Sequence, residues 1–197
     1  MTVLTQAQAT TILRNLGWRV RTTSEYHTAV KHFQQGWNLG PALEVDGVVG
    51  PGPATSAALL LSESRRKAGK KTASAHFSFS EVACRCGGIY DSCPRIWQKR
   101  SAFRMMEGYR SKSGEPLNVV SACRCPSHNA AVNGSTTSRH LTGLACDVAP
   151  HFSVATVKSW RVATHIGYGS VSRKVKHIDM GSSGGTVTSP AVYPNGM

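Results

Sequence analysis

The most constraining feature of this chain is a short apolar segment, residues 144–148, that carries a single carboxylate. The segment is bounded by Gly143 and Pro150, which gives it the length of a β-strand. Because side chains alternate along a strand, Ala145 and Asp147 are expected to share one face. A small residue beside the carboxylate leaves room for a bound ion on that face.

A second alternating segment, residues 175–180, places His177 and Asp179 on one face of another predicted strand. His140 lies in the loop before the first strand. Two imidazoles and a carboxylate are the ligand set of an open zinc site that keeps one position for water. The pattern therefore predicts that His140, Asp147 and His177 converge on one Zn²⁺ ion.

The pattern Ser-x-His-x-x-Gly-x-Ala-x-Asp at residues 138–147, followed by a strand with His-x-Asp, resembles the zinc D-Ala-D-Ala metallopeptidases. These form the M15 family of zinc D,D-peptidases, which act on peptidoglycan stem peptides. Ser121-Ala122-Cys123-Arg124 resembles the Ser-Gly-Tyr-Arg element of that family. The same resemblance continues through Pro126-Ser127-His128-Asn129, Asn133-Gly134 and Ile166-Gly167-Tyr168-Gly169, and it spans residues 77–181.

The resemblance implies that His140, Asp147 and His177 are the metal ligands. It implies that Arg124 holds a substrate carbonyl or carboxylate and stabilises the oxyanion, since a guanidinium stays charged and donates several hydrogen bonds. The alternative for Arg124 is a surface salt bridge. Candidate substrate-binding residues are Ser138 and Tyr168.

The general base is the least defined part of this pattern. Well-known members carry a Glu or a His shortly before the last ligand, where this chain has Lys174, Val175 and Lys176. Asp179 is the nearest carboxylate, either as the base or as the partner that orients a ligand histidine. Lone histidines are more often structural or exposed, so His165 and His128 are weaker candidates.

Residues 1–64 form a predicted three-helix module. Helices are expected over residues 6–16, from Ser24 onward and over residues 53–61, around a turn-rich loop. Phe33-Gln34, Val45-Asp46-Gly47, Gly50-Pro51 and Thr55-Ser56-Ala57-Ala58-Leu59 resemble the peptidoglycan-binding domain found beside wall hydrolases. The resemblance implies wall binding, with Trp37, Asn38 and Asp46 as candidate contacts. The alternative is a helical bundle whose aromatic residues are only core.

A basic stretch, residues 65–76, is expected to be a linker, either an electrostatic tether to an anionic wall or a solvated flexible connection. Residues 77–197 would form the zinc-peptidase domain, with a helix over 96–109 and a strand over 117–120. Residues 186–188 and 192–193 are candidates for an added edge strand. The whole chain is expected to be α+β, with a small, mainly antiparallel sheet.

The formal net charge of +13 predicts an acidic partner. Bacterial peptidoglycan fits, whereas no helix-turn-helix, RNA-binding strand or zinc-finger signature indicates specific nucleic-acid binding. The chain has no apolar run long enough to span a bilayer and no signal peptide at Met1. An endolysin-like monomer released from the host cytoplasm by a holin is the expectation that follows.

All six cysteines lie between Cys84 and Cys146. Cys84-x-Cys86, Cys93 and Cys123-x-Cys125 resemble a structural zinc cluster, but paired ligands in such sites are usually separated by two to four residues. Disulfides suit an enzyme that works outside the cytosol. The interpretation favours at least one disulfide from the 84–93 loop to Cys123 or Cys125, with Cys146 as a free core thiol.

The sequence thus predicts a peptidoglycan hydrolase that cleaves a stem-peptide or cross-bridge bond after D-Ala. A D-Ala-D-Ala carboxypeptidase is the alternative within the family. A catalytically silent, zinc-containing wall-binding protein is the alternative of another class, and the missing base before His177 favours it.

Overall fold

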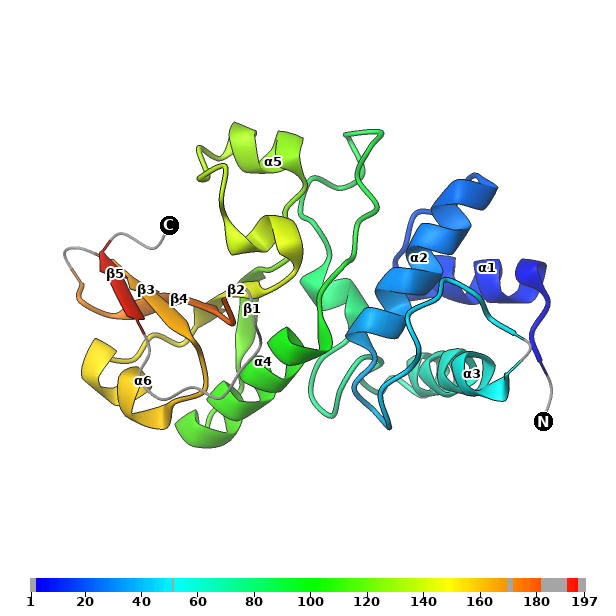
Figure 1. The fold of residues 1–197 in the computed structure, drawn as a ribbon. Helices are drawn as coiled ribbons and strands as arrows, with labels where there is room; N and C mark the ends of the chain where they lie inside the picture. The colour runs from blue at the N-terminus through cyan, green and yellow to red at the C-terminus, as the bar shows by residue number, and fades with distance from the viewer. Residues whose placement is uncertain (1–2, 51, 170–171, 182–190, 195–197) are drawn as a thin grey trace.

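The computed structural model describes residues 3–50, 52–169, 172–181 and 191–194. Three helices gather at one end of the molecule, and a small sheet with its flanking helices forms the other (Figure 1). The helices are α1 (Gln6–Leu16), α2 (Thr23–Gly36), α3 (Pro53–Lys67), the 3-10 helix η1 (Phe79–Val82), α4 (Arg100–Ser113), α5 (Pro126–Ala131), the 3-10 helix η2 (Arg139–Thr142) and α6 (Val154–Trp160). The strands are β1 (Asn118–Ser121), β2 (Ala145–Ala149), β3 (His165–Tyr168), β4 (Val175–Asp179) and β5 (Ala191–Pro194). This is the α+β class that the sequence predicts.

The first two helices begin at capping boxes. The Thr5 side chain accepts from the N–H of Gln8, and Thr22 does the same for Glu25, so the free N–H groups of the first turns find partners. Helix α1 ends at Gly17, whose φ of 113° is a left-handed cap. The bounds expected for α1 are confirmed.

The basic segment 65–76 was expected to be either an electrostatic tether or a solvated flexible connection, and part of it is not solvated. Helix α3 continues to Lys67, and residues 72–74 are buried. The Ser62 hydroxyl donates to the Thr72 carbonyl at 2.9 Å, and the Asn38 N–H donates to the Ala73 carbonyl at 3.0 Å. Small side chains at residues 72–74 allow the segment to pack closely, while Lys70 and Lys71 stay exposed.

The N-terminal helices share their core with the rest of the chain. The ring centroids of Trp18 and Phe79 lie 4.8 Å apart, and those of Phe33 and Phe79 lie 5.4 Å apart. Trp18 Nε1 also donates to the Ile96 carbonyl at 3.0 Å. Buried hydrophobic residues from Leu4 to Met180 therefore belong to one continuous cluster.

The helix expected over residues 96–109 starts later, at Arg100. Ile96 and Trp97 are buried in the preceding loop instead, because the Ile96 carbonyl is bound by Trp18. Apolar spacing predicted the buried face of α4 correctly, and that face carries Phe103, Met106 and Tyr109. The helix covers one side of the sheet together with α6 (Figure 1).

The sheet has the strand order β1-β2-β4-β3-β5. All neighbouring pairs are antiparallel except β3 and β5, which are parallel. Strand β5 contains the expected edge segment 192–193, whereas residues 186–188 lie outside the described residues. The mainly antiparallel sheet is thus as predicted.

The pairing register sorts the sheet into two faces. Asp147 is opposite His177, and Asp179 pairs with both Ala145 and His165. Directly paired residues share a face, so all the polar side chains of β2, β3 and β4 named here project to one side. The other face carries residues with no exposed surface, which pack toward α4 and α6: Cys146, Val148, Ile166 and Ile178.

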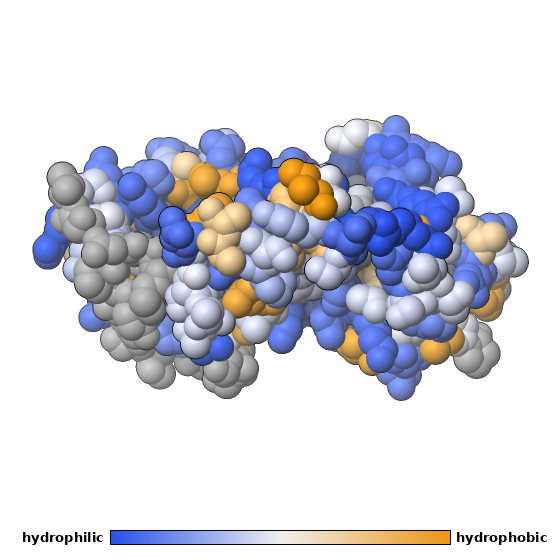
Figure 2. All heavy atoms as spheres, turned by 90° about the horizontal axis from the view of Figure 1, so that it is seen from above, coloured by the Kyte–Doolittle hydropathy of each residue, from blue (hydrophilic) through white to orange (hydrophobic). Residues whose placement is uncertain are grey.

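The surface seen in Figure 2 is mostly hydrophilic, with small separate hydrophobic patches. Exposed large hydrophobic side chains are scattered over both ends of the chain, and Ile89, 82% exposed, is the most accessible of them. Within the described residues, no helix has the length and apolar composition needed to cross a bilayer.

All six cysteines lie in the described range, and all are buried free thiols. The expected disulfide from the 84–93 loop to Cys123 or Cys125 is therefore wrong. The sulfur of Cys123 instead accepts from the Trp97 N–H at 3.2 Å. Cys146 is a free core thiol, as predicted.

Candidate active site

Three side-chain atoms, two nitrogens and one oxygen, come from separate elements and meet on the polar face of the sheet. His140 comes from η2, Asp147 from β2 and His177 from β4. His140 Nε2 lies 3.2 Å from Asp147 Oδ1 and 3.2 Å from His177 Nδ1, and the last two atoms lie 2.9 Å apart. The structure thus brings together the three ligands that the sequence predicts.

This arrangement fits a tetrahedral metal ion. Ligand atoms held about 2.0–2.1 Å from zinc at tetrahedral angles lie roughly 3.3 Å from one another. The three measured separations are close to that value. Two imidazoles and a carboxylate also leave one coordination position open, as hydrolytic zinc sites do.

Hydrogen bonds at the far side of each ring select the nitrogen that faces the centre. His140 Nδ1 donates to the Ala122 carbonyl at 2.6 Å, which leaves Nε2 as the inward atom. His177 Nε2 lies 3.3 Å from Asp179 Oδ2, which leaves Nδ1 as its inward atom. Partners of this kind fix the tautomer and orientation of metal-ligating histidines.

The electrostatics of the cluster favour a positive charge at its centre. Burial opposes ionisation of Asp147, yet hydrogen bonds from His140 and His177 hold the pKa of its carboxyl well below the ordinary value. Burial likewise disfavours the charged form of His177, but its bonds to Asp147 and Asp179 raise its pKa to about 9. A buried cluster that stabilises an added proton also stabilises a cation in the same place.

Arg124 lies at the edge of the cluster and is only 12% exposed. Its Nη2 donates to Asp147 Oδ2 at 3.1 Å, so it binds the carboxylate oxygen that does not face the histidines. Its backbone N–H donates to the His140 carbonyl at 3.2 Å. Arg124 therefore belongs to the site, and its salt bridge is an internal one.

A cavity of about 370 Å³ opens beside the three converging atoms. It is lined by Ser135, Thr137, Ser138, Arg139, His165, Gly167, His177 and Asp179. Among the described residues, the buried Ser138 hydroxyl finds no hydrogen-bond partner. An unpartnered buried hydroxyl at a cavity wall is suited to bind a ligand, because its desolvation is otherwise uncompensated.

Tyr168 does not line this cavity. A bulge between Gly167 and Tyr168 shifts its register, and the Arg173 guanidinium lies 5.5 Å from the centre of its ring. The expectation that Tyr168 contacts substrate is not supported by this position.

A hydrogen-bonded pair that the sequence did not predict lies next to His177, and it is made of Asp179 and His165. Asp179 Oδ1 lies 2.8 Å from His165 Nδ1 and also accepts from the Gly181 N–H at 2.8 Å. His165 was set aside as a lone histidine, yet it lies opposite Asp179 in the β3–β4 register and lines the cavity. No spacing in the sequence specifies this pair, because it depends on the register of β3 against β4.

The three candidate wall contacts of the N-terminal helices differ in how exposed they are. Trp37 is 4% exposed, packs on Phe33 at 5.8 Å between ring centroids, and accepts a hydrogen bond at its carbonyl from Arg100. It is thus a core residue at the junction with α4, and it does not present its ring to a polymer. Asn38 is half-buried beside it. Asp46 is exposed, and its carboxylate accepts from the Val48 N–H and from Gln34, which stabilises the loop.

The comparison with protein families agrees with this geometry. The family model described as Peptidase M15 matches residues 75–179, just over half of the chain. This protein belongs to the peptidase M15 family. The family is one of zinc-dependent metallopeptidases, and its membership makes this chain a hydrolase with a peptidoglycan-related substrate. No curated protein matches the chain.

Proposed function

We propose that this M15 peptidase is an endolysin-like peptidoglycan hydrolase that cleaves a stem-peptide or cross-bridge amide bond after D-Ala. The observation that carries the proposal is the convergence of His140 Nε2, Asp147 Oδ1 and His177 Nδ1 next to a cavity. A zinc ion held by these atoms supplies an activated water and polarises the scissile carbonyl.

Arg124 provides the fixed positive charge of the site. Asp147 and Asn129 hold its guanidinium, and Asn129 Oδ1 accepts from it at 3.4 Å. A preorganised guanidinium at this edge suits the substrate carbonyl or carboxylate and the oxyanion that develops from it. Ser138, at the wall of the same cavity, offers a hydroxyl for a backbone group of the peptide.

Asp179 acts as a positioning residue in this proposal. Its carboxylate is hydrogen-bonded to His177, His165 and the Gly181 N–H. Asp179 lines the cavity but is only 5% exposed, and both of its carboxylate oxygens are already hydrogen-bonded. Of the two roles open from the sequence, orientation of the ligand histidine is the one these contacts support.

His165 is the proton-transfer residue in this proposal. Its Nδ1 lies 2.8 Å from Asp179 Oδ1, and an imidazole oriented by a carboxylate at the cavity is suited to proton transfer. His165 lines the cavity, whereas Lys174 and Lys176 are exposed and do not line it, and Val175 is buried. A histidine on β3 thus replaces the base that the resemblance places just before the last ligand.

The N-terminal helices are proposed to bind the wall through surface residues. The motif that resembles a peptidoglycan-binding domain and the positive charge of the chain support this role. With Trp37 in the core and Asn38 half-buried, the loop around Asp46 is the most exposed of the candidate contacts named from the sequence.

Mass spectrometry of purified cross-linked muropeptides incubated with the protein, with and without a zinc chelator, tests the reaction. Chelator-sensitive conversion of dimers to monomers supports the endopeptidase, whereas loss of one alanine mass identifies the carboxypeptidase instead. If folded, zinc-loaded protein yields no product, the proposed hydrolysis is overturned in favour of the silent wall-binding protein.

Variants of His165 and Asp179 separate proton transfer from positioning. His165→Gln is expected to lower turnover by about 10²–10⁴-fold while zinc content stays at the wild-type level. Asp179→Asn is expected to weaken zinc affinity by roughly 10–100-fold as well as turnover. His128→Gln is the matched control, since His128 lies in α5 and does not line the cavity. Wild-type turnover in His165→Gln would exclude His165 as the base.

A further inference from the structure

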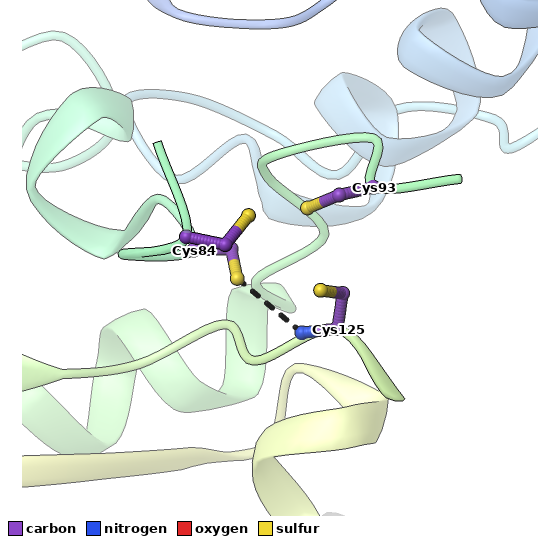
Figure 3. A group of neighbouring side chains, drawn as sticks. Cys84, Cys93 and Cys125 are labelled. Atoms are coloured by element: carbon purple, nitrogen blue, oxygen red, sulfur yellow. Dashed lines mark hydrogen bonds between the residues drawn. The ribbon is translucent and has the colours of Figure 1, made fainter. Parts of the chain in front are cut away.

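Four cysteine side chains meet at a second place in the fold, and none of them lines the cavity. Cys84, Cys86 and Cys93 come from the loop between η1 and α4, and Cys125 is the N-cap residue of α5. All four are buried. Figure 3 shows Cys84, Cys93 and Cys125 directed toward one another from separate stretches of chain.

The spacing of the four sulfur atoms fits one tetrahedral ion. All four lie within 4.8 Å of one another. Four thiolates bound to zinc at about 2.3 Å lie roughly 3.8 Å apart. Two separate disulfides would instead require each bonded sulfur pair to lie at about 2.05 Å, and the structure has all four as free thiols.

The surroundings of the cluster also suit a metal–thiolate centre. The Cys125 N–H donates to Cys84 Sγ at 3.4 Å, the bond drawn in Figure 3. Backbone N–H groups that point at sulfur stabilise thiolates bound to a metal. Arg19 Nη1 donates to the Tyr90 carbonyl at 3.1 Å, which ties the cysteine loop to the N-terminal part of the chain.

The loop needs such a centre because it has little core of its own. Residues 83–99 contain no helix or strand. Ala83 and Ile96 of this segment join the main core, whereas its three cysteines and Trp97 form a small separate cluster with Cys123 and Cys125. Segments that cannot bury enough apolar surface are usually held by disulfides or by metal ions.

We infer that Cys84, Cys86, Cys93 and Cys125 form a second metal site, a closed structural zinc centre distinct from the His140–Asp147–His177 cluster. Each thiol that binds the ion releases its proton to solvent, so binding strengthens as pH rises. The centre does not depend on the proposed reaction, because none of its residues lines the cavity.

The cysteine centre holds the segment that carries Arg124. Cys125 directly follows Arg124 in the chain. Cys123 directly precedes Arg124, and its N–H donates to the Val82 carbonyl at 3.0 Å. The centre therefore fixes both the loop and the start of α5 around one point. Loss of the ion is expected to displace Arg124 from Asp147 as well as to loosen the loop.

Metal analysis of the purified chain tests this inference. We expect two zinc ions per wild-type chain, one in His140→Ala and one in Cys86→Ser. Cys123→Ala is the matched control, since it is a buried cysteine of the same small cluster outside the four-sulfur group, and it should retain two. A single zinc ion per wild-type chain that is lost in His140→Ala would overturn the inference.

Two measurements on folded wild-type protein keep the test independent of whether Cys86→Ser folds. Titration of thiols after denaturation with a chelator, without reductant, should find all six cysteines free, whereas fewer free thiols would indicate disulfides and overturn the site. Cobalt-substituted protein should show strong thiolate-to-cobalt charge-transfer absorption that persists in His140→Ala. Its absence in the wild type would also overturn the site. Since His140→Ala abolishes the proposed hydrolysis but keeps this signal, failure of one proposal is distinguishable from failure of the other.

Discussion

Replacing Gly143 with alanine should destabilise the protein far more than the left-handed backbone conformation of this residue alone predicts. Gly143 caps η2 with a φ of 70°, a left-handed conformation that costs alanine about 1 kcal/mol more than glycine. A Cβ at this position would also lie 2.1 Å from the Trp97 carbonyl oxygen and 2.9 Å from the Trp97 carbonyl carbon. Real Cβ contacts essentially never fall below 3.0 Å, so the backbone around Trp97 must move.

The expected magnitude follows from these two contributions. Overpacking that forces a backbone shift typically costs about 1–3 kcal/mol. Added to the conformational cost, it gives a loss of roughly 2–4 kcal/mol in the free energy of unfolding for Gly143→Ala. The Lys99 N–H donates to the Gly143 carbonyl at 2.9 Å, so the same shift weakens the link between η2 and the start of α4.

Gly114 provides the matched control. It caps α4 with a φ of 72°, and a Cβ there would meet no atom within 4 Å. Gly114→Ala should therefore cost only about 1 kcal/mol. Urea unfolding of both variants in zinc-saturated buffer measures the difference. Equal losses in the two variants would refute the argument that Trp97 demands glycine at position 143.

Three further predictions follow from other parts of the structure. Burial lowers the pKa of His32 to about 4, below its ordinary value of about 6.5, so the unfolded chain binds more protons than the folded chain between these pH values. The free energy of unfolding should therefore fall by up to about 3 kcal/mol as the pH drops through this window, and a urea series on His32→Gln should lack that part of the loss. Asn129 is buried and donates to the carbonyls of Gly134 and Ser135 at 3.0 and 2.9 Å, so Asn129→Ala should lower the free energy of unfolding by about 1–3 kcal/mol in urea. Ser127 is exposed in the same helix, and Ser127→Ala should change it by no more than about 0.5 kcal/mol; similar losses in the two variants would contradict the stabilising role of the Asn129 hydrogen bonds. Adding zinc at about 100 times its Kd to metal-free wild type should stabilise it by about 2.7 kcal/mol per site, a rise in Tm of roughly 5–10 °C in a thermal melt, and His177→Ala should show a smaller rise.

The order of the helices and the faces of the strands were predictable because they depend on local patterns. Helical spacing and the glycine after Leu16 placed α1 between its true bounds. Strand alternation put Ala145 with Asp147, and His177 with Asp179, on shared faces. Caps, turns and periodicity act over a few residues, so a sequence carries them without knowledge of the fold.

Which separate segments meet was decided only by the tertiary structure. Asp179 lies within hydrogen-bonding distance of His165 because β3 pairs with β4 in one particular register, and no spacing in the sequence specifies that partner. The one-residue separation of Cys84 and Cys86 argued against a zinc cluster, yet chain folding brings Cys93 and Cys125 to the same point. Trp37 appeared suited to contact a wall polymer, but packing against Phe33 and α4 buries it. Local propensity sets the elements, whereas burial and long-range pairing choose the partners, because they depend on the whole chain being collapsed at once.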